Sequence, residues 1–236
     1  MNPDLEISDR LICALDVPNT EAAKQIVHEL DGVVSFFKIG IVLHLASGLE
    51  LVNWLLESGK KVFLDLKYYD VPETVKKATE LVAKQGVSFL TIHGNGEIVR
   101  EAVKGRGDSD LRLLSVTVLT SFDDRDLHDL GLQTSVEDLV LLRAQKALEY
   151  GCDGVVSSPK EARMIKRETG GRLIIVTPGI RPSDNEIQDH KRFATPKEAI
   201  MAGADYLVIG RPIIGAPNRK EAALRIVDEM AAAWSA

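Results

Sequence analysis

The sequence predicts an α/β protein folded as a single-domain (β/α)8 (TIM) barrel over residues 1–236. Eight short apolar segments alternate with eight amphipathic segments, and this alternation is typical of a parallel sheet covered by helices. Eight such units suffice to close a barrel, and barrels of this kind use about 250 residues as one domain. No linker rich in Ser, Gly or Pro and no low-complexity segment divides the chain.

The main alternative is an open, doubly wound parallel sheet. Such a sheet normally carries a glycine-rich turn after its first strand, whereas the corresponding turn here is Asp16-Val17-Pro18-Asn19. A Gly-Asn-Gly turn at 94–96 contains GxG but lacks the third glycine of a dinucleotide-binding fingerprint. The closed barrel is therefore preferred.

The predicted strands are short runs enriched in Val, Ile, Leu and Phe, as is typical of buried parallel strands. They span residues 11–16, 35–39, 61–65 or slightly beyond, 87–93, 111–118, 154–156, 173–176 and 206–209. The predicted helices span residues 20–30, 44–58, 72–84, 97–104, 135–150, 159–168, 196–202 and 220–234. Proline near a helix start and glycine just past a helix end support several of these boundaries. The prolines are Pro72, Pro159 and Pro196, and the glycines are Gly86, Gly151 and Gly203.

Composition argues against several classes of function. The net charge is −6 and aromatic residues make up only 5% of the chain, so nothing indicates a basic surface for nucleic acid. The N-terminus is acidic and polar, unlike a secretory signal, and no apolar run approaches the ~20 residues of a membrane helix. Cys13 and Cys152 form no CxxC pair or zinc pattern, which predicts buried thiols in a reducing compartment. We therefore expect a cytoplasmic protein.

Asp65, Lys67 and Asp70 form the most informative pattern in the chain. The first two lie in a predicted buried strand and the third follows it. Because strand residues two apart point to the same side, Asp65 and Lys67 share a face with Phe63, while the opposite face is apolar. Charges in a buried strand destabilise the fold unless they are paired or used in function. The alternative is a salt bridge on an exposed edge strand.

Polar residues stand at the carboxyl end of nearly every predicted strand, where a barrel carries its active site. These residues are Asp16, Lys38, Asp65, Lys67, His93, Thr117, Thr120, Arg181 and Arg211. Each residue alone has an ordinary structural explanation. The whole set on one rim predicts a shared active site.

The two sides of this rim differ in chemistry. Arg181 and the pair Gly210-Arg211 follow the seventh and eighth strands, the usual phosphate site of such barrels. Glycine lets backbone N–H groups approach an oxyanion and a guanidinium suits phosphate oxygens, although a simple turn with a solvated charge is the alternative. On the opposite side, Asp16 and Lys38 offer an acceptor and a donor for sugar hydroxyls. The pattern predicts a phosphorylated sugar compound lying across the barrel mouth.

Six segments resemble those of the orotidine 5'-phosphate decarboxylase family, in the same order. FLDLKYYDVPETV resembles the family's DxKxxDxPxT signature, and the others are ALDVPN, FKIG, TVLTS, VTPGIRP and VIGRPI. The resemblance extends from Leu11 to about Ala216. It is specific as a combination, because related sugar-phosphate enzymes also carry DxKxxD alone. It implies a cofactor-free enzyme of de novo pyrimidine biosynthesis that removes CO2 from C6 of orotidine 5'-phosphate to give uridine 5'-phosphate.

The resemblance also implies roles for the residues around the pyrimidine and the ribose. Asp16 and Lys38 would bind ribose hydroxyls, Asp65 would lie beside the scissile carboxylate, and Lys67 would donate a proton to C6. Flanked by acidic residues, Lys67 should remain an ammonium ion, because nearby negative charge favours the charged form. Thr120 would lie near the pyrimidine.

Two residues are implied to act across a homodimer interface. Asp70, with Thr74, would reach into the active site of the partner subunit. No helix face of the sequence indicates such an interface by itself. The dimer is therefore an implication of the resemblance alone.

The phosphate would be held by Arg181, Arg211 and the backbone of Gly210. One position of the neighbouring loop departs from the family pattern. The family usually has Gln in the loop after the seventh strand, where this chain has His190. Gln188 would serve instead if the loop is shifted.

Two other functions compete with this interpretation. A metal-dependent sugar-phosphate decarboxylase or aldolase of the same barrel group would need an added acid near the second strand to hold magnesium. That strand ends in Lys38, a poor neighbour for a divalent cation. A non-catalytic nucleotide-binding barrel is the second alternative, but binding alone does not require alternating buried charges.

Overall fold

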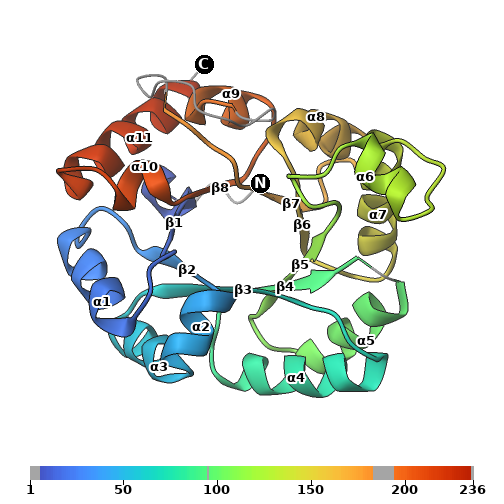
Figure 1. Cartoon of the computed structure of the whole chain (residues 1–236), viewed down its shortest axis with the longest axis horizontal. Coiled ribbons are helices and arrows are strands. Elements are labelled where there is room, and N and C mark those ends of the chain that lie inside the picture. Colours follow the sequence, from blue (N-terminus) through green and yellow to red (C-terminus); the bar gives the residue numbers. More distant parts are fainter. Residues whose placement is uncertain (1–5, 95, 183–193, 235–236) are drawn as a thin grey trace.

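The computed structural model describes residues 6–94, 96–182 and 194–234, which form a closed barrel of eight parallel strands surrounded by helices (Figure 1). Consecutive strands are paired, and β1 closes the barrel on β8. The strands are β1 (Leu11–Ala14), β2 (Phe36–Gly40), β3 (Lys61–Tyr68), β4 (Phe89–His93), β5 (Arg112–Val116), β6 (Gly154–Val156), β7 (Ile174–Thr177) and β8 (Tyr206–Ile209). The predicted (β/α)8 architecture is confirmed.

The helices form the outer layer of the barrel (Figure 1). A 3-10 helix, η1 (Ile7–Arg10), precedes β1. The α-helices are α1 (Thr20–Glu29), α2 (Ile41–Ser47), α3 (Glu50–Glu57), α4 (Pro72–Lys84), α5 (Gly96–Arg106), α6 (Asp124–Asp129), α7 (Val136–Glu149), α8 (Pro159–Glu168), α9 (Pro196–Met201), α10 (Arg211–Ile214) and α11 (Arg219–Trp234).

The outer layer differs from the prediction in two respects. The single helix expected over 44–58 is two helices, because Gly48 ends α2 with a φ of +56°. A residue with a Cβ adopts that conformation rarely, whereas glycine adopts it freely. The short helices α6 and α10 were not predicted, because four to six residues show too little hydrophobic periodicity.

The barrel interior is apolar. Inward-facing side chains from successive strands form one buried cluster, and its members are Ile12, Ala14, Phe36, Phe63, Phe89, Leu114, Val176 and Val208. The Phe36 and Phe89 rings meet edge to face with centroids 4.9 Å apart, and Tyr206 approaches Phe89 at 5.1 Å. Such geometry suits the aromatic quadrupoles. The polar residues at the carboxyl ends of the strands therefore stand on an apolar floor.

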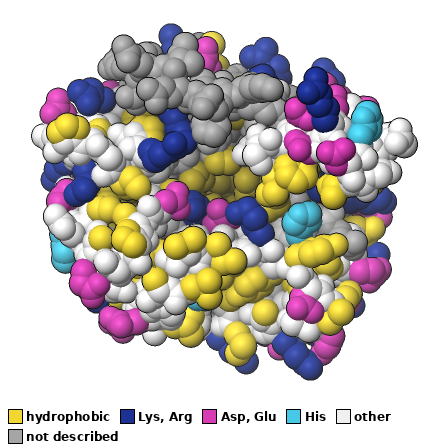
Figure 2. Space-filling model, viewed as in Figure 1, with side chains coloured by type: hydrophobic (Ala, Val, Ile, Leu, Met, Phe, Trp, Pro, Cys, Tyr) yellow, Lys and Arg dark blue, Asp and Glu magenta, His cyan; other side chains and the backbone are white. Residues whose placement is uncertain are grey.

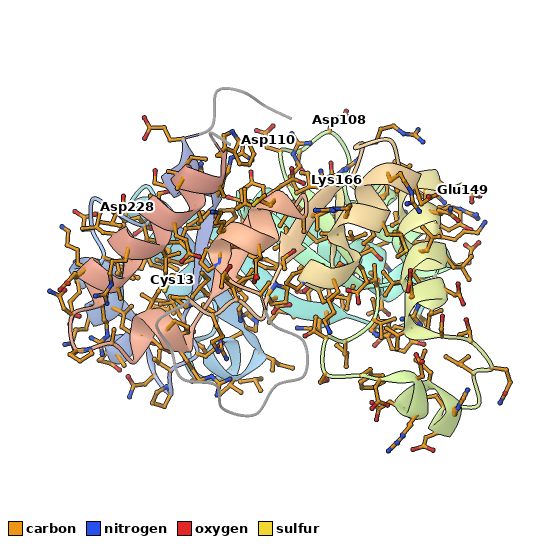
Figure 3. The ribbon with its side chains drawn as sticks, turned by 90° about the horizontal axis from the view of Figure 1, so that it is seen from above. Cys13, Asp108, Asp110, Glu149, Lys166 and Asp228 are labelled. Carbon is orange, nitrogen blue, oxygen red and sulfur yellow. The ribbon has the colours of Figure 1, made fainter. Side chains whose placement is uncertain are left out.

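An ion pair and a hydrogen bond link α8 to two strands at the amino-terminal end of the barrel. Lys166 Nζ of α8 lies 2.6 Å from Asp205 Oδ2, and the same oxygen accepts a hydrogen bond from the backbone N–H of Ile175 at 2.7 Å. Figure 3 places Lys166 with Asp108 and Asp110 at one end of the molecule, opposite α6. These contacts tie a helix to the strands at the end remote from the predicted site.

Both cysteines are free and buried, as expected. Burial raises the pKa of each thiol to about 12. The Cys152 thiol also donates to the carbonyl oxygen of Leu113 at 2.9 Å. Neither side chain is therefore suited to act as a thiolate nucleophile.

No helix in the described ranges combines the length and the apolar character needed to cross a membrane.

Candidate active site

A cavity of about 800 Å³ opens at the carboxyl ends of the strands. Figure 2 shows acidic and basic side chains around a central hollow, with hydrophobic side chains at its base. Most of the predicted site residues line this cavity, namely Asp16, Lys38, Asp65, Lys67, Thr120, Arg181, Gly210 and Arg211. The structure thus brings together residues from both ends of the sequence.

Four side chains form a row of alternating charge, Asp16–Lys38–Asp65–Lys67. Lys38 Nζ lies 3.1 Å from Asp16 Oδ1 and 3.6 Å from Asp65 Oδ2. Lys67 Nζ lies 2.7 Å from the other oxygen of Asp65. The side chains of Lys38 and Asp65 are only 10% and 17% exposed, so each needs its neighbours to offset the cost of desolvation.

The backbone that carries this row is irregular at Lys67, whose φ is +48°. The N–H of Lys67 donates to Thr91 Oγ1 on β4 at 2.9 Å. That hydroxyl lies 3.1 Å from Asp65 Oδ1. Sequence reasoning missed Thr91, because a threonine inside an apolar strand segment is an ordinary β-branched residue.

Asp70 and Thr74 are exposed and are not among the residues that line the cavity of their own chain. The Asp70 carboxylate accepts a hydrogen bond from the backbone N–H of Val71 at 2.6 Å, just before α4. Hydrophobic side chains are exposed nearby in the chain and on α2, and Figure 2 shows them gathered on this face. They are Ile41, Val42, Leu45, Tyr69 and Val71.

One part of the cavity holds two guanidinium groups, those of Arg181 and Arg211. The pKa of Arg181 is lowered first by burial and then by the positive charge of Arg211. Two cations in one part of a cavity favour an anionic ligand. A Cβ on Gly210 would lie 3.3 Å from Asp16 Oδ2, so the backbone here runs close against the charge row.

Two residues predicted for the rim, Thr117 and His93, are not among those that line the cavity. Thr117 is buried and donates its hydroxyl to the carbonyl oxygen of Val156 at 3.0 Å. His93 packs against Tyr69 with ring centroids 4.9 Å apart. Burial, followed by the charges of Arg143 and Lys67, lowers the pKa of His93, which favours the neutral imidazole.

His190 and Gln188 lie outside the described residues. Lys160, at the start of α8, also lines the cavity and was not predicted. Its position after Pro159 in a helix start gave no sign of a functional role.

Comparison with known proteins gives consistent matches over nearly the whole chain. The family described as "Orotidine 5'-phosphate decarboxylase / HUMPS family" matches residues 9–226. The orotidine 5'-phosphate decarboxylase of Nitrobacter winogradskyi is 52% identical over 223 residues, covering 94% of this chain and 93% of the relative. The enzyme of that name from Methylococcus capsulatus is 47% identical over 226 residues, covering 95% and 93%.

Solved structures agree with these matches. The crystal structure of orotidine 5'-phosphate decarboxylase from Lactobacillus acidophilus superposes with a TM-score of 0.83 at 33% identity. The match covers 94% of this chain and 99% of that structure. An uncharacterized conserved protein from Geobacillus kaustophilus has a TM-score of 0.82 at 32% identity, covering 93% and 99%.

Proposed function

The chain belongs to the orotidine 5'-phosphate decarboxylase family, and from this membership we propose that Lys67 donates the proton to C6 in its reaction. The reaction itself is the conversion of orotidine 5'-phosphate to uridine 5'-phosphate in pyrimidine biosynthesis, catalysed by a carboxy-lyase. The observation that carries the proposal is the alternating charge row, which holds the Lys67 ammonium 2.7 Å from Asp65 in the cavity.

The proposed chemistry follows from where charge develops. Breaking the bond between C6 and the carboxylate releases CO2 and leaves an electron pair on C6. This pair lies in the plane of the ring, where the π system cannot delocalise it. The Lys67 ammonium stabilises the pair electrostatically and then transfers a proton to C6. Lys67 regains a proton from water afterwards, and Asp65 lies beside the departing carboxylate.

Lys67 alone is not sufficient for catalysis. One close ion pair contributes about 4 kcal/mol at an effective dielectric constant near 20. Enzymes typically lower the barrier by ~8–23 kcal/mol. Binding of the phosphate, remote from C6, supplies part of the difference by fixing the ring against Lys67.

The other cavity residues are assigned by their place around this centre. Asp16 and Lys38, at one end of the charge row, bind the ribose hydroxyls. Thr120, which lines the cavity after β5, lies near the pyrimidine. Arg181, Arg211 and the backbone of Gly210, which runs beside Asp16, hold the phosphate. Their clustered positive charge supports this assignment.

We further propose a homodimer in which Asp70 and Thr74 complete the partner's site. Both residues are exposed, and the exposed apolar side chains of α2 and of the segment just before α4 provide a surface that association would bury. This arrangement predicts intersubunit complementation. Purified mixed dimers of the Lys67→Ala and Asp70→Asn chains should regain about half of wild-type activity, because one of their two sites combines an intact Lys67 with an intact Asp70.

The matched control for complementation pairs Lys67→Ala with Asp65→Asn. Both changes fall in the cavity of their own chain, so every site of that mixed dimer stays defective. Activity would be measured on heterodimers purified through two different affinity tags. Absence of recovery with Asp70→Asn would remove Asp70 from the partner's site.

We expect the reaction to need no cofactor. The Lys38 ammonium lies 3.1 Å from Asp16 and 3.6 Å from Asp65, and its positive charge makes it a poor neighbour for a divalent cation. No group of three or more His, Cys, Asp or Glu side chains is placed to hold a metal within the described ranges. From family membership we also propose that the protein is cytoplasmic.

Turnover in the presence of EDTA tests the metal-free proposal. The ultraviolet absorbance of orotidine 5'-phosphate should fall at the same rate with and without EDTA. Loss of activity in EDTA that magnesium restores would favour the metal-dependent alternative. Thermal stabilisation by nucleotides without any turnover would favour the non-catalytic barrel.

A further inference from the structure

Strand β3 contains a bulge directly opposite Thr91. Leu64 pairs with Leu90, and the next pair is Tyr68 with Ile92. Residues 65, 66 and 67 of β3 therefore face the single residue 91 of β4. Bulges of this kind redirect side chains and are frequent next to active sites.

The bulge places Lys67 in an unfavourable backbone conformation. Its φ of +48° is the only positive value for a non-glycine residue in the described part of the chain. A side chain with a Cβ clashes with the backbone in this region, so surrounding contacts must hold it there. The backbone N–H of Lys67 donates to the side-chain hydroxyl of Thr91, at 2.9 Å.

The Thr91 hydroxyl joins the two charged residues of β3. It is fully buried and accepts the hydrogen bond from Lys67. Its own proton has two acceptors within reach, Asp65 Oδ1 at 3.1 Å and the carbonyl oxygen of Leu64 at 3.4 Å. The carboxylate is both nearer and the stronger acceptor. One hydroxyl thus fixes the backbone of Lys67 and the carboxylate that faces its ammonium.

We propose that Thr91 is a positioning residue, which holds the Lys67 ammonium and the Asp65 carboxylate in their reactive arrangement. Thr91 is not among the residues that line the cavity, so it acts through the other two. This inference rests on the proposed role of Lys67. It adds that the alignment of the proton donor depends on a hydroxyl from the neighbouring strand.

The test removes the hydroxyl and keeps the shape. Thr91→Val should lower kcat by about 10–100-fold, because small misplacements of a catalytic group are costly. The KM for orotidine 5'-phosphate and the affinity for uridine 5'-phosphate should stay at the wild-type values. Thr91→Ser, which retains the hydroxyl, should restore most of kcat. Unchanged kcat in Thr91→Val would overturn the proposal.

Thr177→Val is the matched control. Thr177 is also a fully buried threonine on a barrel strand, but its hydroxyl has no hydrogen-bond partner among the described residues. The same chemical change there should leave kcat unaltered. If Thr91→Val fails to fold, the pair Thr91→Ser and Thr91→Ala isolates the hydroxyl without the methyl group. Equal kcat in that pair would likewise overturn the proposal.

A double mutant separates this inference from the role of Lys67. In a Lys67→Ala background, Thr91→Val should cause little additional loss of kcat, because residues that act as one unit are not additive. A full additional loss would show that Thr91 acts independently of Lys67. High turnover in Lys67→Ala alone would instead disprove the proposed proton donor, whatever Thr91 does.

Discussion

Replacing Lys67 by alanine should lower kcat by about 10⁵-fold or more while uridine 5'-phosphate still binds. Loss of an ion pair worth about 4 kcal/mol corresponds to about 10³-fold in rate. Loss of proton donation adds about 10²–10⁴-fold. Both effects act on charge that appears only in the transition state, so binding of the product is largely spared.

The measurement combines single-turnover absorbance with calorimetric binding of uridine 5'-phosphate. Lys61→Ala is a suitable control, since Lys61 lies on the same strand and is paired with Asp9 at 3.3 Å, outside the cavity. That variant should retain wild-type kcat. Substantial residual kcat in Lys67→Ala would exclude this side chain as the proton donor.

Replacing Arg211 by alanine should weaken binding of phosphorylated ligands by about 10–100-fold. A hydrogen bond to a charged group contributes about 1.5–3 kcal/mol, and each 1.4 kcal/mol is a factor of ten in affinity. Uridine lacks the phosphate and should bind almost as it does to the wild type.

Calorimetric titration with uridine 5'-phosphate and with uridine separates the two expectations. Arg225→Ala serves as the control, because Arg225 pairs with Glu221 on the exposed side of α11. It should leave both affinities unchanged. Equal weakening of both ligands by Arg211→Ala would contradict the phosphate assignment.

The sequence was sufficient to predict the architecture and most of the cavity. Alternating apolar and amphipathic segments determine the order of strands and helices, and the barrel brings all carboxyl ends of the strands to one rim. Asp65 and Lys67 were expected on one face with Phe63, and all three line the cavity. Thr117 shows the limit of this rule, since its hydroxyl turns to the carbonyl of Val156.

The remaining features depend on geometry that periodicity does not encode. The register shift opposite Thr91 and the positive φ of Lys67 arise from tertiary contacts between two strands. The helix break at Gly48 could not be predicted, because glycine also occurs inside helices and only the structure gives its positive φ. Asp70 and Thr74 do not line the cavity of their own chain, and the role proposed for them requires a second chain, which no pattern within one chain identifies.

The alternating charge row also constrains how this protein can evolve. Lys38 separates two carboxylates and Asp65 separates two ammonium groups. If Lys38 or Asp65 alone is replaced by a neutral residue, the two like charges that it separated face each other in a poorly solvated space, which is strongly unfavourable. A substitution of Lys38 or Asp65 should therefore persist in evolution only together with a change in one of the residues that it separates.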